Sequence, residues 1–130
     1  MNPLTLEWIE KAEGDFATAG RELRARKLPN YDAACFHAQQ AAEKYLKAVL
    51  QEAGRVVPRT HSLAELLGLC LEIDKSFEFL LPDLNLLDAY AVQYRYPGNI
   101  ANRLEARSAF NSSQVIRKTI RTRFGLSLEY

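Results

Sequence analysis

Polar side chains recur at helical spacing between positions 37 and 51. If each residue advances 100° around a helix axis, they fall within an arc of ~80°. The set combines one imidazole, two amides and two ammonium groups, from His37, Gln40, Lys44, Lys47 and Gln51. No acid lies inside the arc, although Glu43 flanks it. Such a face could bind phosphate or pack on an acidic partner. An ordinary amphipathic helix would carry polar residues there too, and this is the simpler interpretation of any single one.

A carboxylate interrupts an otherwise apolar stripe near the N-terminus. Asp15 falls among stripe positions at helical spacing, namely Trp8, Ala12, Ala19 and Leu23. A buried carboxylate must be paired or neutralised. We therefore expect Asp15 either to accept hydrogen bonds from a Lys, Arg or His of a neighbouring helix, or to lie half-exposed at the edge of the stripe.

Two further candidates stand in the segment that reads PRTHSL. Arg59 and His61 come just before the third helical stretch. A lone histidine at such a place usually caps a helix or packs over the end of a bundle. The alternative is a hydrogen-bonding role beside the Arg59 cation at a ligand site.

Three tyrosines surround one arginine between positions 90 and 96. Tyr90, Tyr94 and Tyr96 flank Arg95, and Pro97 ends the helix that carries them. Arg95 is thus expected at a helix C-terminus, where a cation is favoured. Such a cluster can stack nucleic-acid bases or close a dimer interface, and the interface is the more common use.

Charge is distributed unevenly along the chain. Residues 98–130 contain six basic and two acidic side chains, a local surplus of +4, although the whole chain carries only +1. Polar groups follow one flank of the predicted last helix, at Arg103, Arg107, Gln114, Lys118 and Arg121. A solvated basic stripe is the simplest interpretation, and contact with nucleic acid or an acidic protein is the functional one.

These side chains must be positioned by helices. Glycine and proline cluster in breaks at 27–30, 54–58, near Pro82, at 97–99 and at Gly125, and the segments between them have helical periodicity. The third helix should begin after Ser62, with Glu65 completing a capping box. We predict an all-α fold: one up-down bundle of four to five helices, forming a single domain over residues 1–130. Its core should contain Trp8, Ala38, Ala42, Tyr45, Leu84 and Ile116.

Composition excludes several classes of protein. With 48% hydrophobic and 25% charged residues, 130 residues suit one globular domain. Two cysteines and two histidines have no zinc-site spacing, and no phosphate-binding glycine loop or nucleophile elbow occurs. We expect no metal, no cofactor and no membrane segment, because no apolar stretch approaches ~20 residues. The expected location is the cytoplasm.

Several of these motifs together resemble one family. The sequence CFHAQQAAEKYLKAVL, followed by THSL and then by Tyr94-Arg95-Tyr96-Pro97, is similar to the HEPN domain ("higher eukaryotes and prokaryotes nucleotide-binding") over about residues 4–121. The resemblance implies a helical bundle that is often a homodimer. Small prokaryotic members are commonly encoded beside a minimal nucleotidyltransferase, and several act as toxins with that enzyme as antitoxin.

The resemblance also supplies a test for activity. Many members are metal-independent ribonucleases with an Arg, four to six residues and then a His. Arg95 matches the arginine, but no histidine follows it at that spacing. Cleavage through a 2′-hydroxyl needs a proton acceptor or donor, so an inactive module is favoured.

Three hypotheses follow. The first is a nucleotide- or RNA-binding module, partner of a minimal nucleotidyltransferase in a toxin–antitoxin-type pair. Its expected contacts are Lys44, Lys47, Arg59, Arg95, Tyr94 and Tyr96, with His37 and Gln40 on the same helix face. The second is a divergent ribonuclease that uses Arg95 with His61 or His37. The third is a structural protein whose polar faces are dimer interfaces.

Overall fold

Five α-helices and one 3-10 helix make up the chain in a computed structural model that describes residues 1–129. No strand occurs in this range. The elements are α1 (Pro3–Arg24), α2 (Tyr31–Glu52), α3 (Leu63–Leu71), η1 (Lys75–Leu80), α4 (Leu81–Gln93) and α5 (Arg103–Arg123). The predicted all-α bundle is confirmed, and its breaks fall close to the glycine- and proline-rich positions except at Pro82, which lies in the first turn of α4.

Local chemistry explains where the helices begin. The Asn30 side chain accepts a hydrogen bond from the Ala33 amide at the start of α2. Asn102 and Glu105 form a complete capping box at the start of α5. At α3 only half of the expected box is present: Ser62 accepts from the Glu65 amide. The Glu65 carboxylate instead accepts a hydrogen bond from the Thr60 hydroxyl at 2.8 Å.

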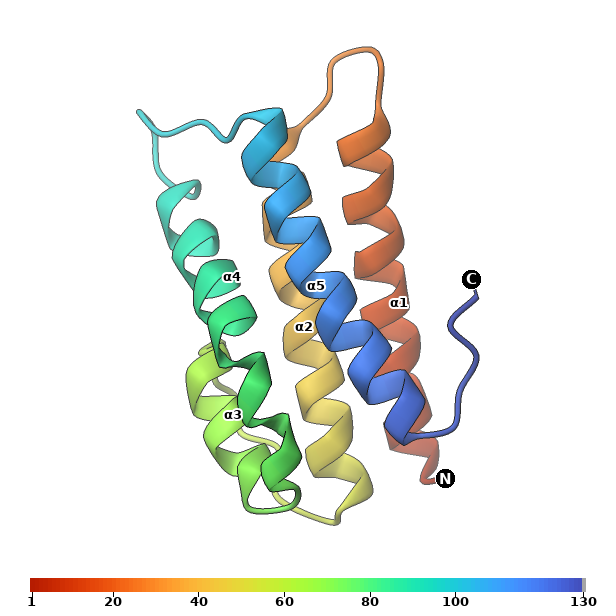
Figure 1. Ribbon diagram of the computed structural model, residues 1–130. Helices are drawn as coiled ribbons and strands as arrows, with labels where there is room; N and C mark the ends of the chain where they lie inside the picture. Colours follow the sequence, from red (N-terminus) through yellow and green to blue (C-terminus); the bar gives the residue numbers. More distant parts are fainter. Residues whose placement is uncertain (130) are drawn as a thin grey trace.

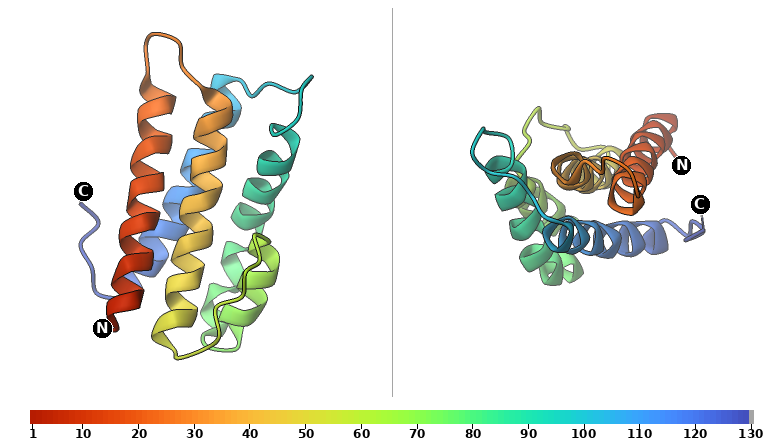
Figure 2. Two further views of the ribbon diagram at one scale, coloured as in Figure 1. Left: turned by 180° about the vertical axis from the view of Figure 1, so that it is seen from behind. Right: turned by 90° about the horizontal axis from the view of Figure 1, so that it is seen from above.

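The long helices α1, α2 and α5 pack side by side, and α4 covers the remaining side of α2 and α5 (Figure 1). Helices α1, α2, α4 and α5 alternate in direction, while α3 and η1 fill the end where α4 begins (Figures 1 and 2). The core is confirmed for Ala38, Ala42, Tyr45, Leu84 and Ile116, which are fully buried. Trp8 is partly buried and packs against that core.

A buried ion-pair network ties α1 to α5. Arg117 donates two hydrogen bonds to the Glu13 carboxylate, at 2.8 and 2.9 Å, and the Tyr45 hydroxyl donates a third. Burial acts to raise the pKa of Glu13, but the hydrogen bonds from Arg117 and Tyr45 and the nearby positive charges outweigh it, so the pKa falls. The Arg121 guanidinium lies 3.4 Å from the same carboxylate. Part of the C-terminal positive surplus is therefore neutralised inside the bundle.

The chain after α5 folds back along these arginines. Arg117 donates to the Leu128 carbonyl at 2.9 Å, and Arg121 donates to the Ser127 carbonyl. Of the basic flank predicted for the last helix, Arg121 is thus committed to internal contacts. Arg103, Arg107 and Lys118 remain exposed.

Candidate functional site

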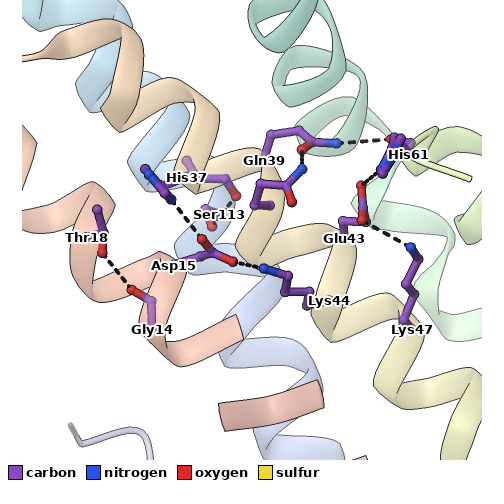
Figure 3. A network of polar contacts seen from close by, with 12 residues as sticks. Gly14, Asp15, Thr18, His37, Gln39, Glu43, Lys44, Lys47, His61 and Ser113 are labelled. Atoms are coloured by element: carbon purple, nitrogen blue, oxygen red, sulfur yellow. Dashed lines mark hydrogen bonds and ion pairs between the residues drawn. The ribbon is translucent and has the colours of Figure 1, made fainter. Parts of the chain in front are cut away.

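Asp15 is the centre of a polar cluster between α1 and α2 (Figure 3). Its carboxylate lies 2.8 Å from Nδ1 of His37 and accepts a hydrogen bond from the Lys44 ammonium. The Asp15 side chain is only 12% exposed. The expected pairing with a neighbouring helix is confirmed, and it uses two members of the polar face of α2. The Lys44 charge is consequently matched within the fold.

A second cluster forms on the other flank of α2. Lys47 donates to the Glu43 carboxylate at 3.1 Å, and both side chains are almost completely buried. The Lys47 ammonium also lies 5.6 Å from the centre of the Trp8 ring, whose nitrogen donates to Gln51. The structure therefore places Lys47 in the interior rather than on a solvent-exposed face.

His61 is held by two residues of α2. Its Nδ1 lies 3.1 Å from Oε1 of Glu43, and its backbone carbonyl accepts a hydrogen bond from the Gln39 amide at 3.1 Å (Figure 3). The Gln40 amide in turn donates to Gln39. A carboxylate only accepts hydrogen bonds, so Nδ1 donates to Glu43 and Nε2 is left for another partner. The His61 side chain is 79% exposed. These contacts join the two motifs of the sequence, FHAQQAAEK and THSL, into one unit.

Beside His61 lies an open groove of about 530 Å³ between α2 and α4. Residues from both helices and from the segment before α3 line it, namely Phe36, Gln39, Gln40, His61, Ser62, Asp88, Ala91, Val92 and Arg95. A second hollow of about 360 Å³ adjoins it and shares Phe36, Ala91 and Arg95. Arg95 therefore lies where the two hollows meet. The structure brings together Arg95 and His61, which are 34 positions apart in the chain.

Arg95 differs from the other predicted cations of the site. It is exposed, and within residues 1–129 no carboxylate forms an ion pair with it. Arg59 is also exposed, but it does not line the groove. Lys44 and Lys47 are absent from the lining as well. The positive charge of the groove comes from Arg95.

The two tyrosines that flank Arg95 have different environments. Tyr94 is buried, and its hydroxyl donates a hydrogen bond to Glu105. Tyr96 is 59% exposed on the segment between α4 and α5. Tyr90 packs against Tyr94 with 5.6 Å between ring centres. Tyr94 therefore has a structural role in holding that segment, and Tyr90 and Tyr96 supply accessible ring surface.

Sequence reasoning missed Phe36, Gln39 and Asp88. Asp88 accepts a hydrogen bond from the Leu63 amide at 2.9 Å, at the start of α3. Burial raises the pKa of Asp88, although its hydrogen bonds act in the opposite direction. Gln39 could have been found from its place next to the apolar positions 38 and 42, where a buried amide needs a partner. Nothing in the sequence marks Asp88 as a neighbour of that amide.

Neither a metal site nor a membrane-spanning helix is found in the part of the chain that the structure describes. No group of three or more His, Cys, Asp or Glu side chains there is arranged to hold a metal ion. Over the same residues, none of the helices combines the length and apolar character that crossing a bilayer requires.

Comparison with known proteins shows the family to which the chain belongs. The HEPN domain matches residues 5–123. A crystal structure of the protein TT1696 from Thermus thermophilus superimposes with a TM-score of 0.75 and 31% sequence identity. The likeness covers 91% of this chain and 96% of the Thermus chain. No curated protein sequence matches. Because the family match spans nearly the whole chain, this protein belongs to the HEPN domain family.

Proposed function

We propose that this HEPN module binds a nucleotide or a nucleotide unit of RNA in the groove between α2 and α4. The observation that carries the proposal is the position of Arg95. Its guanidinium has no ion pair within the described chain and stands where two hollows meet. Phosphate is the natural partner of such a group, because guanidinium binds phosphate oxygens through paired, charge-assisted hydrogen bonds.

The rest of the groove is suited to a base and a sugar. The Phe36 side chain is 43% exposed at the wall that both hollows share. An accessible aromatic ring can stack on a base, and amide groups such as that of Gln40 can pair with base edges. The Asp88 carboxylate in the wall accepts a hydrogen bond from the Leu63 amide at 2.9 Å, so part of its charge is already matched by a backbone donor at the start of α3.

Titration with nucleotides tests this proposal. The probes are adenosine and uridine 5′-monophosphate, and isothermal calorimetry gives the dissociation constants. Changing Arg95→Ala should weaken binding by about 1–3 kcal/mol, roughly five- to 150-fold, because a charge-assisted hydrogen bond is lost. Binding should also weaken as salt is raised.

The matched control is Lys75→Ala. Lys75 is exposed at the start of η1, at the end of the bundle opposite to the segment between α4 and α5 (Figure 1). This variant removes the same unit of charge and should bind as the unchanged protein does. Equal losses in the two variants, or no binding of either nucleotide, would contradict the proposal.

We further propose that the module is the partner of a minimal nucleotidyltransferase in a toxin–antitoxin-type pair. Membership of the HEPN family supports this partnership. The test begins with the gene next to the one for this chain. If it encodes a minimal nucleotidyltransferase, the two proteins should co-elute after co-expression. If there is no such gene and no complex forms, the proposed partnership is wrong, although the proposed nucleotide binding is not affected.

Ribonuclease activity is the second candidate, and one observation favours it. Arg95 and His61 line the same groove, and Glu43 occupies Nδ1 of His61 so that Nε2 is free to exchange a proton. We expect cleavage to be slow or absent, since the spacing of the family's motif is incomplete. The assay uses a fluorogenic RNA with chelator present. Robust cleavage that His61→Ala abolishes, while His37→Ala leaves it intact, would establish the enzyme instead.

A further inference from the structure

A third hollow, at one end of the bundle, has three arginines in its lining. It measures about 570 Å³ and lies between the turn that joins α1 to α2 and the start of α5. Three of its lining residues are arginines and none is acidic: the lining is Leu23, Arg24, Ala25, Arg26, Pro29, Tyr31 and Arg103. All three arginines are exposed, and within residues 1–129 none is in an ion pair.

The acids at this end of the molecule are committed to other contacts. Glu22 accepts a hydrogen bond from the Asn30 amide at 3.0 Å, and Asp32 accepts one from the Ala101 amide at 2.8 Å. Glu105 accepts from the Asn102 amide and from a tyrosine hydroxyl. These carboxylates fix the turn and the start of α5 in place. None of these three carboxylates lines the hollow.

The guanidinium of Arg24 lies close to Gly20, one turn back on α1. A Cβ atom added at Gly20 would lie 2.9 Å from Nη1 of Arg24 and 3.2 Å from Cε1 of Phe110. The Arg24 side chain thus runs back across Gly20 toward α5, and a larger residue at position 20 would obstruct it. The absence of a side chain at Gly20 provides the room.

Helix dipoles explain only part of this cluster. Arg24 lies in the last turn of α1, where a cation is favoured. Arg103 is the first residue of α5, where the positive end of the dipole disfavours a cation. Three neighbouring positive charges also repel one another. An anion in the hollow would relieve the repulsion and would face the start of α5.

We propose that the hollow of Arg24, Arg26 and Arg103 is a second phosphate site, which takes the backbone of a nucleic-acid strand whose other end occupies the Arg95 groove. The two sites flank one turn: Pro29 and Tyr31 line the arginine hollow, and Asn30 and Asp32 line the hollow beside Arg95. This inference rests on the proposed function. It makes the ligand an oligonucleotide rather than a single nucleotide.

Length dependence provides the test. The probes are uridine 5′-monophosphate and 5′-labelled oligouridylates of two to twelve nucleotides, measured by calorimetry and fluorescence anisotropy. Affinity should rise with length until a strand reaches both sites. The triple variant Arg24→Gln, Arg26→Gln, Arg103→Gln should bind the twelve-nucleotide probe at least about tenfold more weakly at low salt. The slope of log affinity against log salt should fall by about 2, or about 0.7 for each lost phosphate contact. Its affinity for the mononucleotide should not change.

A matched triple variant removes the same charge elsewhere. Lys11→Gln, Lys75→Gln, Lys118→Gln changes three exposed lysines outside both sites. Circular dichroism checks that both triple variants are folded. Equal weakening in the two would show that only net charge matters and would overturn the proposal. Equal loss of mononucleotide and oligonucleotide binding in the arginine variant would also overturn it, since the hollow would then belong to the first site.

The second site can also be tested without the first. Inorganic pyrophosphate is titrated while the side-chain N–H signals of the arginines are followed by NMR. One result would be shifts at Arg24, Arg26 and Arg103 with nucleotide binding unchanged in Arg95→Ala. This result would confirm phosphate binding in the arginine hollow but refute nucleotide binding in the Arg95 groove. Absence of those shifts, with oligonucleotide binding independent of length, would refute the second site alone.

Discussion

The Glu13 carboxylate provides a prediction at the scale of single residues. Its pKa is lower in the folded chain than the ordinary 4.5, because the hydrogen bonds from Arg117 and Tyr45 prevail over burial. The ionised carboxylate therefore favours the folded state. This contribution is complete above about pH 4.5 and disappears as the pH falls through the folded-state pKa. In Glu13→Gln the free energy of unfolding should be lower at neutral pH, and the difference should shrink in acid.

Urea unfolding at pH 7 and at steps down to pH 3 measures this difference. The control is Glu10→Gln, at an exposed position one turn away on α1. The exposed site should show almost no difference at any pH. A Glu13→Gln difference that stays constant into acid would contradict the assignment.

Sequence reasoning at this scale succeeded where a residue broke a pattern. Asp15 interrupts an apolar stripe, and a buried carboxylate needs a partner, so the sequence predicts a contact with a neighbouring helix. His37 and Lys44 of α2 are the partners. Lys47 and Tyr94 break no pattern. Their burial depends on Glu43 and Glu105, and the contacts with these carboxylates form only in the folded chain. A single helix projection cannot reveal such partners.

At the scale of elements, the capping box at the start of α5 leads to a testable prediction. Asn102 accepts a hydrogen bond from the Glu105 amide and Glu105 accepts one from the Asn102 amide, so each satisfies a donor of the other. Asn102→Ala should lower the free energy of unfolding by about 1 kcal/mol. Asn111→Ala, at an exposed position inside the same helix, should be neutral or slightly stabilising because alanine is the better helix former. Chemical denaturation compares the two, and equal effects would count against the cap.

The elements themselves could largely be predicted from glycine, proline and hydrophobic spacing. The exception is the segment before α4. The sequence predicts a break near Pro82, but η1 runs directly into α4 and Pro82 lies in the first turn, where no backbone donor is needed. Asp74 begins η1 by accepting from the Ser76 amide. A 3-10 helix that continues into an α-helix has no periodic signal long enough to recognise.

At the scale of the whole molecule, exposed apolar side chains surround the segment between α4 and α5. They include Val92, Tyr96, Ile100 and Leu104, each at least 59% exposed. Exposed apolar groups on one side of a small domain favour self-association. We predict a homodimer at micromolar concentration, and Ile100→Asp should shift it toward monomer. Val56→Asp, at an exposed site in the α2–α3 connection, should not.

Light scattering coupled to gel filtration measures both variants. A monomer at every concentration would exclude the dimer, and dissociation by both substitutions would show that this surface does not form the interface.

The groove between α2 and α4 could not be predicted from the sequence. It forms only when α4 lies beside α2, and the spacing of residues within one helix does not specify that arrangement.

The double attachment of His61 has an evolutionary consequence. Gln39 contacts the backbone carbonyl of position 61, which every amino acid possesses, whereas Glu43 contacts the imidazole ring. Replacement of the histidine during divergence would leave the first contact intact and remove the second. Among descendants of a common ancestor, position 39 should therefore persist whichever residue occupies 61, while position 43 would keep only its buried ion pair with Lys47 once the histidine is lost.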